Sequence, residues 1–251
     1  MTDGVKGKLR FSFQELSREI QALQTLAVDF VDVRSTRALA HLSEQLDGLW
    51  DAEEGRTFRW QLQDLWTIES EGEYEPGDRR GSKHIVASIS GVWEVQPLGG
   101  TSRKERSRRF LEFCGIASTR VRIYEASDQA NPIAMWRMEL GDANSPGCFF
   151  HVQVLGESDA NPFPKSVSVP RLPSLFVLPT GAVEYVLGEL FQDRWAQAAM
   201  ENSGPVQQWT AIQKRRLSCL LDWQSRTVRD SLTSPWIALK RAKPASALFN
   251  V

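Results

Sequence analysis

The side chains that could carry out chemistry fall on one predicted face of a β-sheet. Between residues 84 and 153, several segments alternate apolar and polar side chains with period two, which is typical of strands with one buried face. The polar positions are His84, Ser88, Glu94, Arg120, Arg122, Tyr124, Arg137, Glu139, His151 and Gln153. If the strands share a face, histidine, glutamate and arginine side chains lie on one surface. There they could transfer protons and stabilise the charge of a phosphate.

Four of these residues form the candidate catalytic set: His151, Arg122, Arg137 and Glu139. His151 stands between aromatic and aliphatic neighbours, so we expect its surroundings to be partly apolar. The set would suit a metal-independent nuclease. The competing interpretation, which we favour, is a solvated outer sheet face on which Arg–Glu pairs only fix the strand register. The sequence leaves open whether the protein is an enzyme.

The most basic segment, residues 99–109, is a candidate nucleic-acid-binding loop. Its positive side chains are Arg103, Lys104, Arg106, Arg108 and Arg109. Such a run can contact phosphates, which provide affinity without reading sequence. The alternative is a solvated loop whose charge is offset by the acidic segment 69–78. If the loop binds nucleic acid, charge reversal at positions 106, 108 and 109 is predicted to abolish binding without lowering thermal stability.

Signatures of better-known chemistry are missing from the sequence. It contains no phosphate-binding glycine loop, dinucleotide fingerprint, nucleophile elbow, zinc-protease helix or EF-hand loop. The cysteines, Cys114, Cys148 and Cys219, are too widely spaced to indicate a zinc site or a disulfide framework. We therefore predict neither a metal site nor a cofactor.

Composition sets the remaining limits on function. The 251 residues include 30 basic and 31 acidic side chains, so any attraction to nucleic acid or membrane would have to be local. The chain has no run of eighteen apolar residues and no apolar signal segment near its start, which favours a cytoplasmic protein that does not associate with membranes. Nine tryptophans are unusual, and they could belong either to the core or to an interface.

Periodicity predicts the elements that position these residues. Ser12 and Glu15 form an S-x-x-E capping box ahead of a helix beginning at Phe13, and a second helix is expected over 36–53. Strands follow between 57 and 156, centred on a hairpin at 132–156. Five prolines indicate an extended crossover at 157–179. Two helices, a Thr180-capped one and another from Pro205 to about residue 232, precede a basic, loosely held tail.

The predicted fold is one α+β domain covering residues 1–251. It divides into a helical part at 12–54, a sheet at 57–156, the crossover at 157–179, a helical part at 180–233 and a basic tail at 234–251. Because the strands are consecutive, we expect a mainly antiparallel sheet of five or six strands flanked by an N-terminal helical pair and two C-terminal helices.

Two classes of function fit this outline. The first is a non-catalytic intracellular binding or assembly protein that engages a protein partner, or a second copy of itself, through its amphipathic helices and a Trp-rich surface. The alternative is a protein that acts on nucleic acid or a nucleotide, with the mixed sheet face as the floor of the site and the basic loop as its rim. A small-ligand site between the sheet and the terminal helices is a third option.

Overall fold

The computed structural model describes residues 9–70, 84–99, 109–141, 147–155, 171–175 and 178–249. In this part of the chain the elements are β1 (Leu9–Ser12), α1 (Phe13–Ala27), the 3-10 turn η1 (Val33–Ser35), α2 (Thr36–Trp50), β2 (Phe58–Trp66), β3 (Ile85–Leu98), β4 (Phe110–Glu125), β5 (Asp128–Leu140), β6 (Phe150–Leu155), β7 (Arg171–Pro173), α3 (Pro179–Met200), α4 (Gly204–Arg229) and α5 (Pro235–Arg241). The α+β class predicted from the sequence is confirmed.

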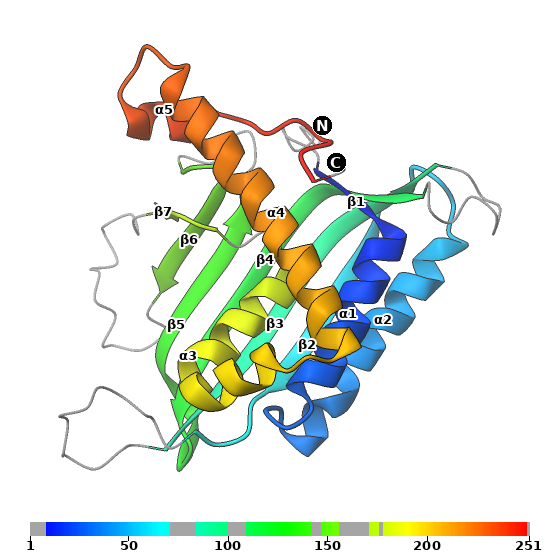
Figure 1. The fold of residues 1–251 in the computed structure, drawn as a ribbon, viewed down its shortest axis with the longest axis vertical. Coiled ribbons are helices and arrows are strands. Elements are labelled where there is room, and N and C mark those ends of the chain that lie inside the picture. Colours follow the sequence, from blue (N-terminus) through cyan, green and yellow to red (C-terminus); the bar gives the residue numbers. More distant parts are fainter. Residues whose placement is uncertain are drawn as a thin grey trace.

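The strands form one antiparallel sheet in the order β2-β3-β4-β5-β6-β7, and β1 pairs with the first half of β4. Helices α1 to α4 lie together on one face of this sheet (Figure 1). The N-terminal helical pair and the two C-terminal helices are therefore confirmed. The sheet has seven strands in the described residues, compared with the five or six predicted. The prediction missed the short strands β1 and β7, because they have too few residues to show periodicity.

The central hairpin has the predicted faces. Its register pairs Arg137 with Gln153 and Glu139 with His151, while Trp136 and Met138 face the core. Side chains that pair directly across antiparallel strands share a face. The polar residues of β5 and β6 therefore lie together on the face opposite the helices.

A bulge in β2 corrects the predicted face of that strand. Strict alternation from Trp60 and Leu62 would place Asp64 and Trp66 on the apolar side of β2. The register shifts between Leu62 and Leu65, so Leu65 is buried in the core instead. The extra residue reverses the alternation beyond it. Asp64 consequently meets Ser88 across the outer face, and Trp66 contacts the ring of Tyr124.

The tryptophans are mainly core residues. Five are buried, at positions 50, 60, 93, 195 and 209, and three more are half-buried. Trp60 shows the pattern, since its indole N–H donates to the Leu42 carbonyl at 3.0 Å beneath α2. Trp236 differs, with 66% of its surface exposed. The tryptophans therefore do not form the broad surface that their number suggested.

The chain ends depart from the local predictions. Helix α1 begins at Phe13 as predicted, but the Ser12 side chain caps nothing. The tail is not loosely held, because Phe249 is buried and stacks on Phe11 at 5.4 Å. Apolar burial of this size anchors the segment after α5 to β1. In the described ranges, no helix has both the length and the apolar character that crossing a bilayer requires.

Candidate functional site

Glu139 is the centre of a polar cluster on the face of β5 and β6 opposite the helices. Gln153 Nε2 donates to Glu139 Oε2 at 2.8 Å, and Arg137 Nε lies 2.8 Å from Glu139 Oε1. His151 Nε2 lies 3.4 Å from Glu139 Oε2 and 3.3 Å from Gln153 Nε2. We call Arg137, Glu139, His151 and Gln153 the sheet cluster. Three of the four predicted catalytic residues thus come together.

The orientation of His151 follows from its neighbours. Its Nδ1 lies 2.9 Å from the Cys148 carbonyl oxygen, and since a carbonyl only accepts, Nδ1 carries a proton. In the neutral ring, Nε2 can accept from Gln153, whereas in the protonated ring it can donate to Glu139. The imidazole therefore has a partner in either state. It is 2% exposed, so a ligand would meet Arg137 and Glu139 first.

The charge in the sheet cluster is unbalanced. Burial alone would raise the pKa of Glu139, but the hydrogen bond with His151 and the charges of Arg137, His151 and Arg171 outweigh it, so this pKa is lowered from 4.5. One carboxylate thus faces two guanidinium groups as well as an imidazole. A surplus of positive groups around a single acid can attract a further anion.

Arg122, the fourth predicted catalytic residue, lies outside the sheet cluster, at a neighbouring position of β4. It pairs with Met135 and Ser88 on the same sheet face, while Arg120 takes the position opposite Arg137. The predicted polar face is also less solvated than expected, since Ser88 and His151 are buried. His84 lies elsewhere, 3.0 Å from Glu69 at an exposed position.

The predicted basic loop is represented in the described residues by Arg109. Its side chain is 1% exposed, donates to the Ala52 carbonyl at 2.8 Å and lies over the rings of Phe13 and Trp50. Burial lowers its pKa. The side chain therefore holds the start of β4 against α2, and nucleic-acid contact by the basic loop stays a prediction. Arg103, Lys104, Arg106 and Arg108 lie outside the described residues.

A second polar cluster, which the sequence interpretation missed, lies between α1, α3 and α4. Glu19 is fully buried, and its carboxylate accepts from both Nη atoms of Arg216 at 2.7 and 2.8 Å and from Gln213 Nε2 at 2.8 Å. Thr180 also donates to it, which explains why that hydroxyl does not cap α3. We call Glu15, Glu19, Thr180, Gln213, Arg215 and Arg216 the helix cluster.

Glu15 completes the helix cluster at its solvent side. It accepts from Arg216 Nη2 at 2.9 Å and pairs with Arg215, whose Nη1 donates to the Phe249 carbonyl at 2.8 Å. This pairing explains why Glu15 makes no capping box. The sequence did contain a sign of this cluster. Glu19 follows Leu16 by three residues, so its charged side chain falls within the apolar stripe of α1. A charge at a buried position requires a partner.

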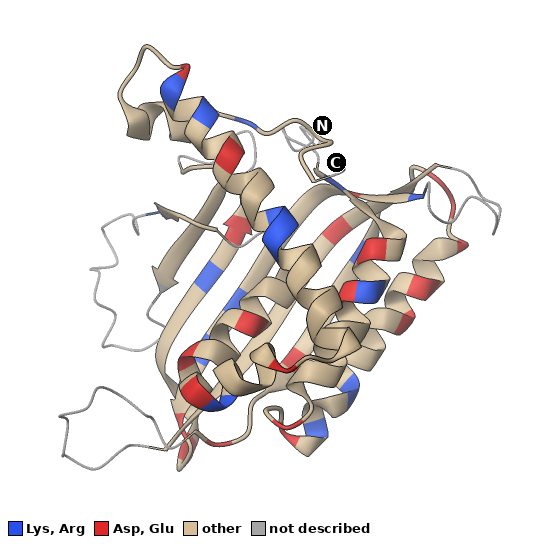
Figure 2. Ribbon diagram, in the orientation of Figure 1, with Lys and Arg blue, Asp and Glu red and all other residues tan. Residues whose placement is uncertain are grey.

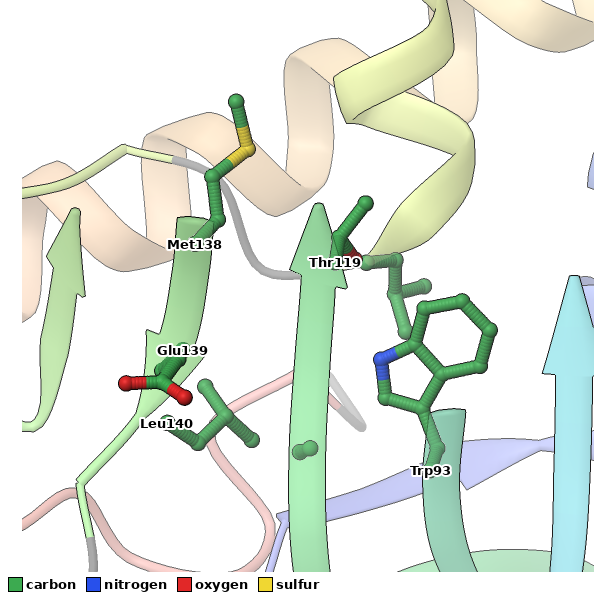
Figure 3. Close-up of a pocket in the computed structure, with 7 residues that line it drawn as sticks. Trp93, Thr119, Met138, Glu139 and Leu140 are labelled. Carbon is green, nitrogen blue, oxygen red and sulfur yellow. The ribbon is translucent and has the colours of Figure 1, made fainter. Parts of the chain in front are cut away.

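Two hollows adjoin these clusters. The smaller, of about 10 Å³, lies beside Trp93, Thr119 and Leu140, and could hold about one water. Figure 3 shows Met138 extending from β5 toward the helices and the ring of Trp93 lying beside Thr119, and these side chains bound the hollow. The larger, of about 530 Å³, lies between α3 and α4 and adjoins Gln213 and Arg216 of the helix cluster.

The surface at the far end of α4 is apolar and basic. Leu221, Leu232, Trp236 and Ile237 are exposed there, and Figure 1 shows this end of α4, with α5, projecting from the rest of the fold. Lys and Arg residues also occur along this stretch of ribbon (Figure 2). They are Arg226, Arg229, Lys240, Arg241 and Lys243. We call these apolar and basic residues the distal surface.

Potential metal ligands and free thiols occur singly or in pairs among the described residues. Among them, no group of three or more His, Cys, Asp or Glu side chains is placed to hold a metal ion. Cys114, Cys148 and Cys219 are free thiols. Burial raises the pKa of Cys148, against the opposing charge of Lys240, so its thiolate is disfavoured.

Comparison with known proteins returns no family model, no curated protein and no solved structure that matches the chain.

Proposed function

We propose that this chain is a binding protein that engages an acidic, amphipathic segment of a protein partner through the distal surface. The observation that carries the proposal is the exposure of three apolar side chains, Leu232, Trp236 and Ile237. They lie within six consecutive residues, in the segment that joins α4 to α5 and in the start of α5. A monomer rarely leaves such a group of apolar side chains uncovered without a use for it. Tryptophan is also the residue type most often found among the strongest contributors to protein binding.

The charge of the distal surface indicates the chemistry of the partner. Residues 222–243 contain five basic side chains and two acidic ones, Asp222 and Asp230, which leaves a net charge of +3 in a chain whose total is −1. Opposite charge on a partner would speed association and suppress unsuitable partners. An amphipathic segment with acidic side chains beside its apolar face would complement this surface.

The test compares the unmodified chain with the double variant Leu232→Ser/Trp236→Ser after low-salt purification from the native cells. We expect a protein in stoichiometric amount with the unmodified chain, lost from the double variant and weakened by added salt. Val33→Ser provides the matched control, since Val33 is 80% exposed and lies between α1 and α2, away from the distal surface.

Three outcomes would contradict this function. One is recovery of the same partner with the double variant. Another is a doubling of mass in sedimentation, abolished by the double variant, which would assign the distal surface to a second copy of the chain. The third is binding to phosphatidylserine vesicles without any protein partner, which would assign it to a lipid surface.

The sheet cluster supports a second candidate function, the binding or cleavage of a nucleotide or nucleic acid. The supporting observation is that His151, Glu139 and Arg137 are joined by contacts of 3.4 Å or less. If this function holds, adenosine monophosphate binds in calorimetry, and Arg137→Met removes the binding while Arg59→Met, on β2, does not. Equal binding by both variants, or none by the unmodified chain, would contradict it.

A further inference from the structure

The cavity between α3 and α4 has the dimensions of a small-molecule site. Its volume of about 530 Å³ lies in the range of about 300–1,000 Å³ in which such sites occur. Leu175 and Leu178, which precede α3, line one part of it, and Tyr185 of α3 and Leu217 of α4 line another. These four side chains provide an apolar wall that an aliphatic or aromatic group could cover.

Two positively charged side chains adjoin this wall and have unused donors. Lys214 has no hydrogen bond or ion pair with any described residue. Arg216 is 3% exposed, and although its Nη atoms bind the carboxylates of the helix cluster, its Nε–H is buried without a hydrogen-bond partner. Because this Nε–H has almost no accessible surface, the positive group that a ligand in the cavity can reach directly is the exposed ammonium group of Lys214.

One acidic side chain lines the same cavity. Burial raises the pKa of Glu184, the indole of Trp209 lowers it, and the charge of Glu19 raises it again, with a net increase above 4.5. Glu184 is therefore protonated more readily than an exposed glutamate. Glu15 and Glu19 are already paired with Arg215 and Arg216. The ammonium group of Lys214, which lines the cavity without a partner among the described residues, thus points to an anionic ligand.

We propose that this cavity binds an aliphatic carboxylate, with its hydrocarbon part against Leu175, Leu178 and Leu217 and its carboxylate toward Lys214. This inference goes beyond the proposed function, because the site is separate from Trp236 and α5. A carboxylate forms a charge-assisted hydrogen bond with the ammonium group of Lys214. A neutral alcohol would keep the apolar contact alone, and an ammonium group would be repelled by Lys214.

Calorimetry on the full chain tests the proposal with three probes that share a hydrocarbon chain: decanoate, decanol and decylamine. We expect decanoate to bind most tightly and decylamine most weakly. Lys214→Met should weaken decanoate binding by about tenfold, the loss expected for one charge-assisted hydrogen bond, and leave decanol binding unchanged. Arg37→Met, on α2, removes an exposed charge outside the cavity and is the matched control.

A blocking variant separates binding in the cavity from binding elsewhere. Gly181 lines the cavity, and a Cβ at this position would meet only Gln213 Oε1, at 3.9 Å. Gly181→Leu should therefore fill the space, abolish binding of all probes and preserve the melting temperature, since leucine favours helix. Equal affinity for all three probes, no binding by the unmodified chain, or decanoate binding that survives Gly181→Leu would each overturn the proposal.

Discussion

The helix cluster and the sheet cluster bury similar side chains but differ in charge balance. In the helix cluster two glutamates meet two arginines, and the central carboxylate is fully buried. In the sheet cluster Glu139 alone faces Arg137, Arg171 and His151, and it keeps 22% side-chain exposure. A balanced and buried set compensates its own charge, whereas an unbalanced set at the surface can accept another anion.

Position in the fold explains the difference. The helix cluster joins residues 197 to 201 positions apart on α1 and α4, so it connects the two ends of the chain. The sheet cluster joins neighbouring strands of one hairpin, where cross-strand pairs already set the register. The helix cluster is therefore expected to contribute most to stability, and the sheet cluster is the better candidate for a functional role.

The largest expected effect is in the helix cluster. Glu19→Gln leaves the guanidinium of Arg216 buried with an incomplete set of partners, so we expect a loss of about 3–5 kcal/mol in the free energy of unfolding, measured by urea denaturation. Glu44→Gln, at an exposed position on α2, is the control and should change little. A loss below about 1 kcal/mol would mean that the helix cluster does not contribute as its burial suggests.

A smaller effect, dependent on pH, is expected in the sheet cluster. Glu139→Gln should cost about 1.5–3 kcal/mol at neutral pH, because it weakens charge-assisted contacts with Arg137 and His151. The folded-state pKa of Glu139 lies below 4.5, so its contribution is present above that pH and is lost as the pH falls through the folded-state pKa. The unmodified chain and the variant should therefore converge in acid.

The measurement is the free energy of unfolding between pH 3 and pH 7, with Glu201→Gln, at an exposed position after α3, as the control. A difference between Glu139→Gln and the unmodified chain that stays constant across this range would show that the charge of Glu139 does not stabilise the folded state.

The smallest effect is expected for an ion pair at the rim of the same sheet face. Arg59 Nε lies 3.9 Å from Glu94 Oε1 across β2 and β3, and the arginine side chain is 65% exposed. Solvent screening limits such pairs to about 0.2–1 kcal/mol, so Arg59→Gln should cost no more than this, and less at 0.5 M salt. A loss as large as that of Glu19→Gln would remove the distinction between buried and rim charges.

Local patterns in the sequence determined the helices, the antiparallel sheet and the central hairpin, because period and turn residues act over a few positions. They also placed Arg137, Glu139 and His151 on one face, since a correct hairpin register brings them together. The bulge in β2 did not follow from alternation, because one inserted residue leaves the composition of the strand unchanged.

Only the tertiary structure decided which charges are buried and what they meet. Glu15 and Thr180 have good local roles as helix caps, but the fold brings Arg216 and Glu19 to them, and the stronger buried partners prevail. Arg109 belongs by sequence to a basic loop, yet packing places it over Trp50. Such contacts join distant segments, so no local pattern specifies them. The same reason hid the cavity between α3 and α4.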